Sequence, residues 1–153
     1  MYRRSLYTFW KRSVPPPAMT VFDAADKNVC TVKRQSTSTP LQALTLLNDT
    51  QIVEAARFVS QRMLSEGGSS TNERVAWAFH LITGRRASER ELNVLEQLYA
   101  EQRTIFAADA NAAKKLLAVG EKRNDEKFDR ADLAAGTALG IALFNYDGAV
   151  MRR

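Results

Sequence analysis

The sequence predicts an all-α fold: an irregular domain of about six helices behind an extended, proline-containing N-terminal segment. Two observations favour this class. From residue 40 onward, apolar residues recur at the three- and four-residue spacing of a helix face, and several of these stretches open with a helix-capping pattern. The 153 residues, 45% apolar and 25% charged, are enough for one globular domain that buries a core without disulfides or a metal.

The first 39 residues differ from the rest in having no helical period. Residues 2–13 are rich in β-formers and predict a short strand or extended segment. Pro15, Pro16 and Pro17 predict a polyproline II conformation, and residues 18–38 predict a long ordered loop. We therefore divide the chain into a basic extended segment, 1–39, and an α-helical body, 40–153.

The helical body begins with a capping pattern. Thr39 can cap the helix, Pro40 occupies the first helical position, and the Gln42 side chain can reach back to the cap. This helix, about 40–47, is predicted to end near Asn48 and Asp49, either of which can cap a second helix, about 50–65. Its predicted apolar face consists of Ile52, Ala55, Ala56, Val59 and Met63.

Two further capping boxes, Ser70 to Glu73 and Ser88 to Glu91, predict helices over about 71–83 and 89–107. Asp109 can cap a short helix that extends to about 119, residues 120–127 form a linker, and Asp129 caps a last helix over about 130–145. On that helix Gly136 and Gly140 share one face, which favours close packing against another helix.

The net charge of +5 is concentrated in the N-terminal segment. Residues 1–40 contain seven lysines and arginines against two acids, so the remaining residues are neutral. Such a surplus can attract an anionic polymer or an acidic partner, or it can be paired within a larger protein. We favour internal pairing and do not expect a nucleic-acid partner. The sequence shows neither a signal peptide nor a membrane span.

Single residues of catalytic type have ordinary interpretations. One histidine and one cysteine cannot supply the usual zinc ligands, and no C-x-x-C-H motif is present for haem attachment. We expect His80 to be a partly buried core residue with one hydrogen bond. Cys30, near several cations, is either a reactive thiol or a small buried hydrophobe, and we favour the second.

Two other functions remain open at this point. Asp23 and Asp26 lie close in sequence and could act as the acid and base of a hydrolase for polysaccharide. The aromatic residues Tyr7, Phe9 and Trp10 stand among arginines, where they could stack on bases or sugar rings or serve as a hydrophobic anchor.

The chain resembles a domain family of unknown function at the C-terminal end of large exported planctomycete-type proteins. The residues that carry the resemblance are Arg3-Arg4-Ser5-Leu6-Tyr7, Pro16-Pro17, Phe22-Asp23, Cys30, Arg34, Thr39-Pro40-Leu41-Gln42-Ala43-Leu44 and Leu47-Asn48-Asp49. The similarity is specific over residues 3–57 and looser through Thr83-Gly84-Arg85-Arg86 and Glu91. Beyond residue 110 it rests on general pattern.

The resemblance implies that the chain is the C-terminal part of the family's domain. It also implies export of the parent protein to the periplasm or cell surface. Many such proteins carry a planctomycete-type cytochrome c domain, so haem c is expected in a separate domain and no cofactor in this chain. The family has no established catalytic residues.

We therefore expect a non-catalytic interaction or scaffold module of a larger exported, redox-linked protein. Its expected partners are the upstream half of its own domain or other domains of the parent. The candidate interaction or structural cluster consists of Arg3, Arg4, Trp10, Asp23, Cys30 and Arg34. We expect the arginines and Asp23 to hold the loop or an upstream segment by ion pairs and hydrogen bonds. No metal site is expected.

Overall fold

A computed structural model describes residues 7–11, 13–25, 28, 30–33 and 36–150 of the chain. The chain divides into two compact units, an N-terminal unit, Met1–Thr45, and a C-terminal unit, Leu46–Arg153. Within the described residues the secondary structure is helical, and the only β-type contact is an isolated bridge between Lys11 and Val14. The all-α prediction is confirmed.

The N-terminal unit contains a helix that the sequence did not predict, α1 (Pro17–Val21). Pro17 stands in the first turn, where its missing N–H removes no helical hydrogen bond, and Pro16 before it is extended with φ −58° and ψ 126°. We expected polyproline II through all three prolines and a loop from residue 18. Both expectations are wrong over Pro17–Val21, which is helical. Proline fixes φ at a value that also suits the first turn of a helix.

The helix α2 (Pro40–Asn48) begins with the reciprocal hydrogen bonds of a capping box. The Gln42 amide donates to the Thr39 hydroxyl (3.3 Å), and the Thr39 amide donates to Gln42 Oε1 (3.1 Å). Gln42 Nε2 donates to the Val21 carbonyl (2.9 Å) and to the Thr37 hydroxyl (3.1 Å). A buried glutamine thus ties α2 to the end of α1.

The sequence predicted six helices from residue 40 onward. Five of them lie in the C-terminal unit, and all six have ends within two residues of the prediction. They are α3 (Thr50–Glu66), α4 (Thr71–Thr83), α5 (Glu89–Ala108), α6 (Ala110–Leu117) and α7 (Arg130–Phe144). A short α8 (Asp147–Val150), which was not predicted, follows. The side chains of Asp49, Ser70, Ser88, Asp109 and Asp129 each accept backbone amides at a helix start. None of the helices in the described part of the chain is long and apolar enough to cross a membrane.

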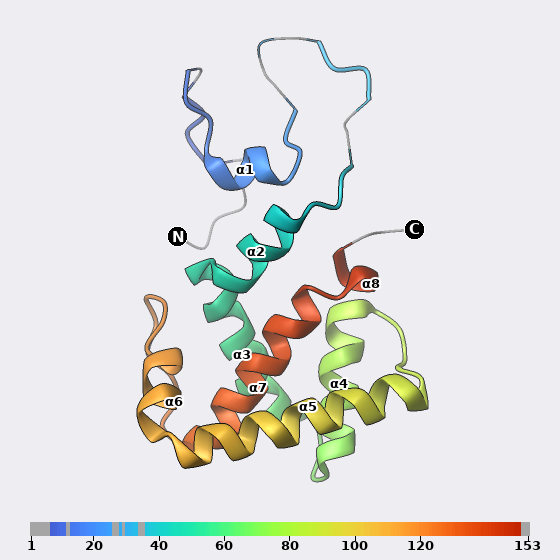
Figure 1. The fold of residues 1–153 in the computed structure, drawn as a ribbon, viewed down its shortest axis with the longest axis vertical. Helices are drawn as coiled ribbons and strands as arrows, with labels where there is room; N and C mark the ends of the chain where they lie inside the picture. Colours follow the sequence, from blue (N-terminus) through green and yellow to red (C-terminus); the bar gives the residue numbers. More distant parts are fainter. Residues whose placement is uncertain (1–6, 12, 26–27, 29, 34–35, 151–153) are drawn as a thin grey trace. The chain divides into compact units, whose positions relative to one another are not determined.

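The helix α7 is the centre of the C-terminal unit and contacts α3, α4, α5, α6 and α8 (Figure 1). It is buried along most of its length because its inward residues are small or aliphatic. A Cβ on Gly136 would collide with Ser60, and one on Gly140 would press on Ala56, so the two glycines let α7 approach α3 closely. The interpretation of these glycines as packing positions is confirmed.

Several residues differ from the prediction in whether their side chains are buried. His80 is exposed on α4, because only one stripe of that helix, with Val75 and Phe79, faces the core. Cys30 is also exposed, which contradicts the interpretation as a small buried hydrophobe. On α3, Ala55 is exposed, and the buried face includes two charged residues, Glu54 and Arg57, that the predicted face omitted.

Candidate functional site

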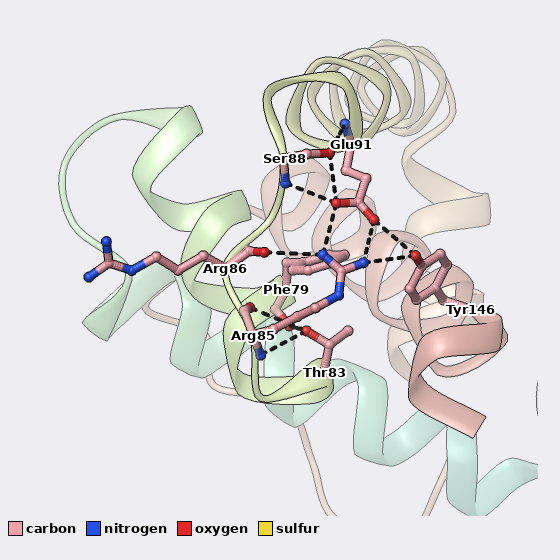
Figure 2. Close-up of polar contacts among 7 residues, drawn as sticks. All are labelled: Phe79, Thr83, Arg85, Arg86, Ser88, Glu91 and Tyr146. Carbon is pink, nitrogen blue, oxygen red and sulfur yellow. Dashed lines mark hydrogen bonds and ion pairs between the residues drawn. The ribbon is translucent and has the colours of Figure 1, made fainter. Parts of the chain in front are cut away.

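A group of charged and aromatic side chains lies where the α4–α5 turn meets the end of α7. Gly84 ends α4 with φ 74°, a left-handed conformation that a glycine adopts readily, and the chain then turns through Arg85 into α5. Arg85 forms a bidentate ion pair with Glu91, with Nη1–Oε2 and Nη2–Oε1 distances of 3.0 and 2.5 Å (Figure 2). We call Phe79, Arg85, Ser88, Glu91 and Tyr146 the Arg85 cluster.

The Glu91 carboxylate accepts five hydrogen bonds from other described residues. Besides the two from Arg85, it accepts the Ser88 amide (2.9 Å), the Ser88 hydroxyl (2.8 Å) and the Tyr146 hydroxyl (2.9 Å). The Arg85 hydrogen bonds, followed by those of Ser88, hold the pKa of Glu91 far below its ordinary value. Glu91 is therefore a fixed anion that has no proton to give, and its role is to hold the turn together.

Arg85 is held on its other sides by aromatic rings. Its guanidinium lies 4.8 Å from the ring centre of Phe79 and 5.9 Å from that of Tyr146, within cation–π range. Nη2 also donates to the Tyr146 hydroxyl (2.9 Å). Since Tyr146 follows α7, the Arg85 cluster joins three parts of the chain: the end of α4, the start of α5 and the residues after α7 (Figure 2).

An apolar pocket of about 270 Å³ lies beside the Arg85 cluster. Its walls come from α4, α5, α7 and the residue Tyr146. The apolar lining residues are Phe79, Val94, Leu95, Ala142, Leu143 and Tyr146, and the charged ones are Arg90 and Glu91. The side chain of Arg90 is exposed and takes part in no ion pair or hydrogen bond with the described residues. The lining of this pocket suits an apolar group.

A second group of charged side chains is buried in α3, where it holds a loop in place. Glu54 and Arg57 form an ion pair at 3.3 Å with side chains 2% and 1% exposed. Glu54 accepts the amides of Glu121 (3.2 Å) and Lys122 (2.9 Å), and Arg57 donates to the carbonyl of Leu117 (2.5 Å) and to that of Lys122. The predicted linker 120–127 is thus anchored to α3 by a buried pair.

Asp23 is the predicted cluster residue whose contacts are best defined. Its carboxylate accepts the Thr37 amide (2.7 Å) and the Thr37 hydroxyl (2.8 Å), and it lies 3.4 Å from Gln42 Nε2. Its backbone has φ 56°. Asp23 therefore closes the loop between α1 and α2, an arrangement that counts against an acid or base role in a hydrolase. Asp26, the other predicted carboxylate, lies outside the described residues.

The remaining predicted residues are not brought into one site by the described structure. Arg3, Arg4 and Arg34 lie outside the described residues. Trp10 is half-buried and Cys30 is exposed. Thr39 and Gln42 form the capping box of α2, Asp49 caps α3, and Asn48 is the last residue of α2. Among the described residues, no group of three or more histidine, cysteine, aspartate or glutamate side chains is placed to hold a metal.

Neither the Arg85 cluster nor the Glu54–Arg57 pair was predicted from the sequence as a site. The family resemblance is looser over Thr83 to Arg86 and at Glu91. In addition, Tyr146 is 55 residues beyond Glu91. The buried pair has a spacing that permits an ion pair on a helix, because Glu54 and Arg57 are three residues apart. On the predicted helix, however, both residues lie opposite the predicted apolar face, so no local pattern indicated that they are buried.

The fold and the site together define a helical domain in which several charged groups hold turns and loops in place. Its sequence matches the family model described as PSD1, Protein of unknown function (DUF1553), over residues 1–99, and the chain belongs to this family. The matched part includes Arg85 and Glu91 but ends before Tyr146. No curated protein and no solved structure matches the chain.

Proposed function

We propose that this chain is a non-catalytic interaction module of a larger exported protein and that residues 1–45 dock onto another part of that protein. The observation that carries the proposal is the absence of an apolar core in the described part of the N-terminal unit. There the only buried side chain is Gln42, which is polar. The buried apolar residues of the described chain begin at Val53.

The N-terminal unit instead exposes large apolar side chains. They are Tyr7, Phe9, Val14, Val32, Leu41 and Leu44, with Phe9 83% and Leu41 56% exposed. Many exposed apolar side chains in one segment are typical of an interaction surface, because ordering a segment costs conformational entropy that apolar burial has to offset. A partner that covers these side chains would supply that burial.

The charge of the segment supports a partner of acidic character. The whole surplus of positive charge lies in residues 1–40, and charge complementarity governs the rate and specificity of docking more than its affinity. An upstream or neighbouring domain of the same protein, with acidic groups around an apolar surface, would fit both features.

The family resemblance supports the setting of the proposal. In this proposal the parent protein is redox-linked and is exported to the periplasm or the cell surface. Any haem c lies in a separate domain. The described contacts support a scaffold role, since the carboxylates of Asp23 and Glu91 both hold turns of the chain.

The test is a binding titration between the whole chain and the remaining domains of the parent protein, expressed separately and followed by calorimetry. A Leu41→Gln/Leu44→Gln variant should bind at least ~10-fold more weakly, since burying one leucine contributes about 1.5–3 kcal/mol. Ile105→Gln on α5, at a side chain 53% exposed in the C-terminal unit, is the matched control and should bind normally. Equal affinity for both variants, or no binding by the unmodified chain, would overturn the proposal.

A further inference from the structure

The geometry points to a ligand site in the apolar pocket between α4, α5 and α7: it accepts a compact apolar group that carries a carboxylate. This site lies wholly in the C-terminal unit, so it goes beyond the proposed docking of residues 1–45, and either can fail without the other. The lining residues that would contact this ligand or set the charge of the site are Phe79, Arg90, Glu91, Val94, Leu95 and Tyr146.

The size and lining of the pocket select a small apolar body. Its volume of about 270 Å³ lies just below the range of pockets that hold drug-sized ligands, so a single ring or branched aliphatic group fills it. Aromatic rings of Phe79 and Tyr146 and the aliphatic side chains of Val94 and Leu95 form the contact surface. Because helices and the held Tyr146 provide these walls, the pocket is formed before a ligand arrives.

The charges at the pocket select an anion over a cation. Two charged residues line it, and they are in opposite situations. Glu91 already accepts five hydrogen bonds and is paired with Arg85, so its charge is used within the protein. Arg90 makes no ion pair or hydrogen bond with the described residues, so a cation is left for an incoming carboxylate.

The ligand needs both parts because the apolar walls lie beside Arg90, which has no partner among the residues that the structure describes. The apolar group alone would leave Arg90 without a partner, and a carboxylate alone would gain only a solvent-exposed ion pair, which contributes little. Two sources supply this chemistry: a free organic acid, or the last residue of a polypeptide, whose side chain and terminal carboxylate are adjacent.

The test is a two-dimensional NMR titration of the backbone amides of the whole chain with phenylbutyrate. Amide shifts should concentrate at Val94, Leu95 and the facing residues of α7, with a Kd of about 1 mM, as expected for so few ligand atoms. Phenylbutylamine, the same apolar body with a cation, should bind more weakly than phenylbutyrate. Equal binding of the acid and the amine, or shifts spread away from the pocket, would overturn the inference.

Arginine variants test whether Arg90 itself binds the carboxylate or whether any positive charge on this surface would do so. Arg90→Gln should weaken phenylbutyrate binding about 3- to 10-fold and leave binding of the uncharged phenylbutanol unchanged. Arg86→Gln is the matched control, since Arg86 is exposed, does not line the pocket and points away from the Arg85 cluster (Figure 2). Val94→Glu, at an exposed lining position, should abolish binding of the acid by repulsion. An Arg90→Gln variant that binds the acid as well as the unmodified chain does would contradict the assignment.

An experiment with two peptides distinguishes the two sources of the ligand. An acetylated tripeptide that ends in phenylalanine is compared with the same peptide amidated at its C-terminus. Tighter binding of the free-acid peptide than of phenylbutyrate, lost on amidation, supports a polypeptide end. Tighter binding of phenylbutyrate supports a free organic acid. Failure of phenylbutyrate and both peptides to bind would overturn the site, whatever the outcome for residues 1–45.

Discussion

Arg85 and Glu91 form a bidentate ion pair across the α4–α5 turn, and the hydroxyl of Tyr146 hydrogen-bonds to both. The pair has a local and a distant function. Locally, Glu91 completes the capping box of α5 with Ser88. At a distance, Tyr146 connects that turn to the end of α7, so a short motif in sequence holds together helices that are far apart in the chain.

The first prediction concerns the pH dependence of this ion pair. Because the pKa of Glu91 is lower in the folded than in the unfolded chain, its stabilising contribution is complete above the unfolded value near 4.5 and is lost as pH falls toward the folded value. Glu91→Gln should lower the melting temperature at pH 7 by about 3 °C. That difference should shrink below about pH 4.5, in thermal unfolding followed by circular dichroism. A difference that stays constant between pH 7 and pH 3 would contradict the role of the charge.

The second prediction concerns the buried pair in α3. Glu54→Gln should destabilise the fold by about 3–5 kcal/mol, because it leaves the Arg57 charge buried without its counterion. Urea denaturation measures this loss. Glu66→Gln removes an exposed partner of Arg62 on the same helix and is the control, with an unchanged unfolding midpoint. Equal midpoints for the two variants would show that the buried pair does not anchor the linker.

The third prediction concerns the contact between α3 and α7. Gly136→Ala places a Cβ against Ser60 and Met63 and should cost about 1–3 kcal/mol in the free energy of unfolding. Ser60→Gly combined with Gly136→Ala makes room for the added methyl group. The double variant should therefore be less destabilised than the sum of the two single variants, measured as a double-mutant cycle. Additive losses would mean that the two residues do not limit the approach of the helices.

The fourth prediction concerns Tyr99, which is buried in the core of the C-terminal unit. Burial, aided by the nearby charge of Asp132, raises the pKa of Tyr99 to about 12 from an ordinary value of 10. The neutral phenol is thus favoured in the folded state, and its contribution to stability is present below pH 10 and is lost as pH rises toward 12. The unmodified chain should therefore lose more stability than Tyr99→Phe between pH 10 and 12 in urea denaturation. Tyr7→Phe, at an exposed tyrosine, should behave as the unmodified chain does.

Local sequence signals account for much of the fold. Helix starts can be read from side chains that reach amides two or three residues away, as Ser70 with Glu73 and Asp129 with the first turn of α7 show. Short helices are harder to predict. The α1 and α8 helices have five and four residues, too few for an apolar period, and neither buries a side chain.

The candidate site depended on contacts that no local pattern reveals. Arg57 meets Leu117 sixty residues away, and Arg85 meets Tyr146 sixty-one residues away, so these contacts depend on the tertiary packing of the helices. Exposure also depends on tertiary structure. His80 lies next to the buried Phe79 and yet faces solvent, since neighbouring helical positions point in different directions.

We have proposed that residues 1–45 depend on a partner surface for their apolar burial. Hydrogen–deuterium exchange can detect this dependence, by comparing the backbone amides of α1 and α2 in this chain alone and in the proposed parent protein. We expect fast exchange in the isolated chain and protection at least ~10-fold greater in the parent protein, while α3 to α7 exchange alike in both. Equal protection of α1 and α2 in the two proteins would show that no partner surface covers them.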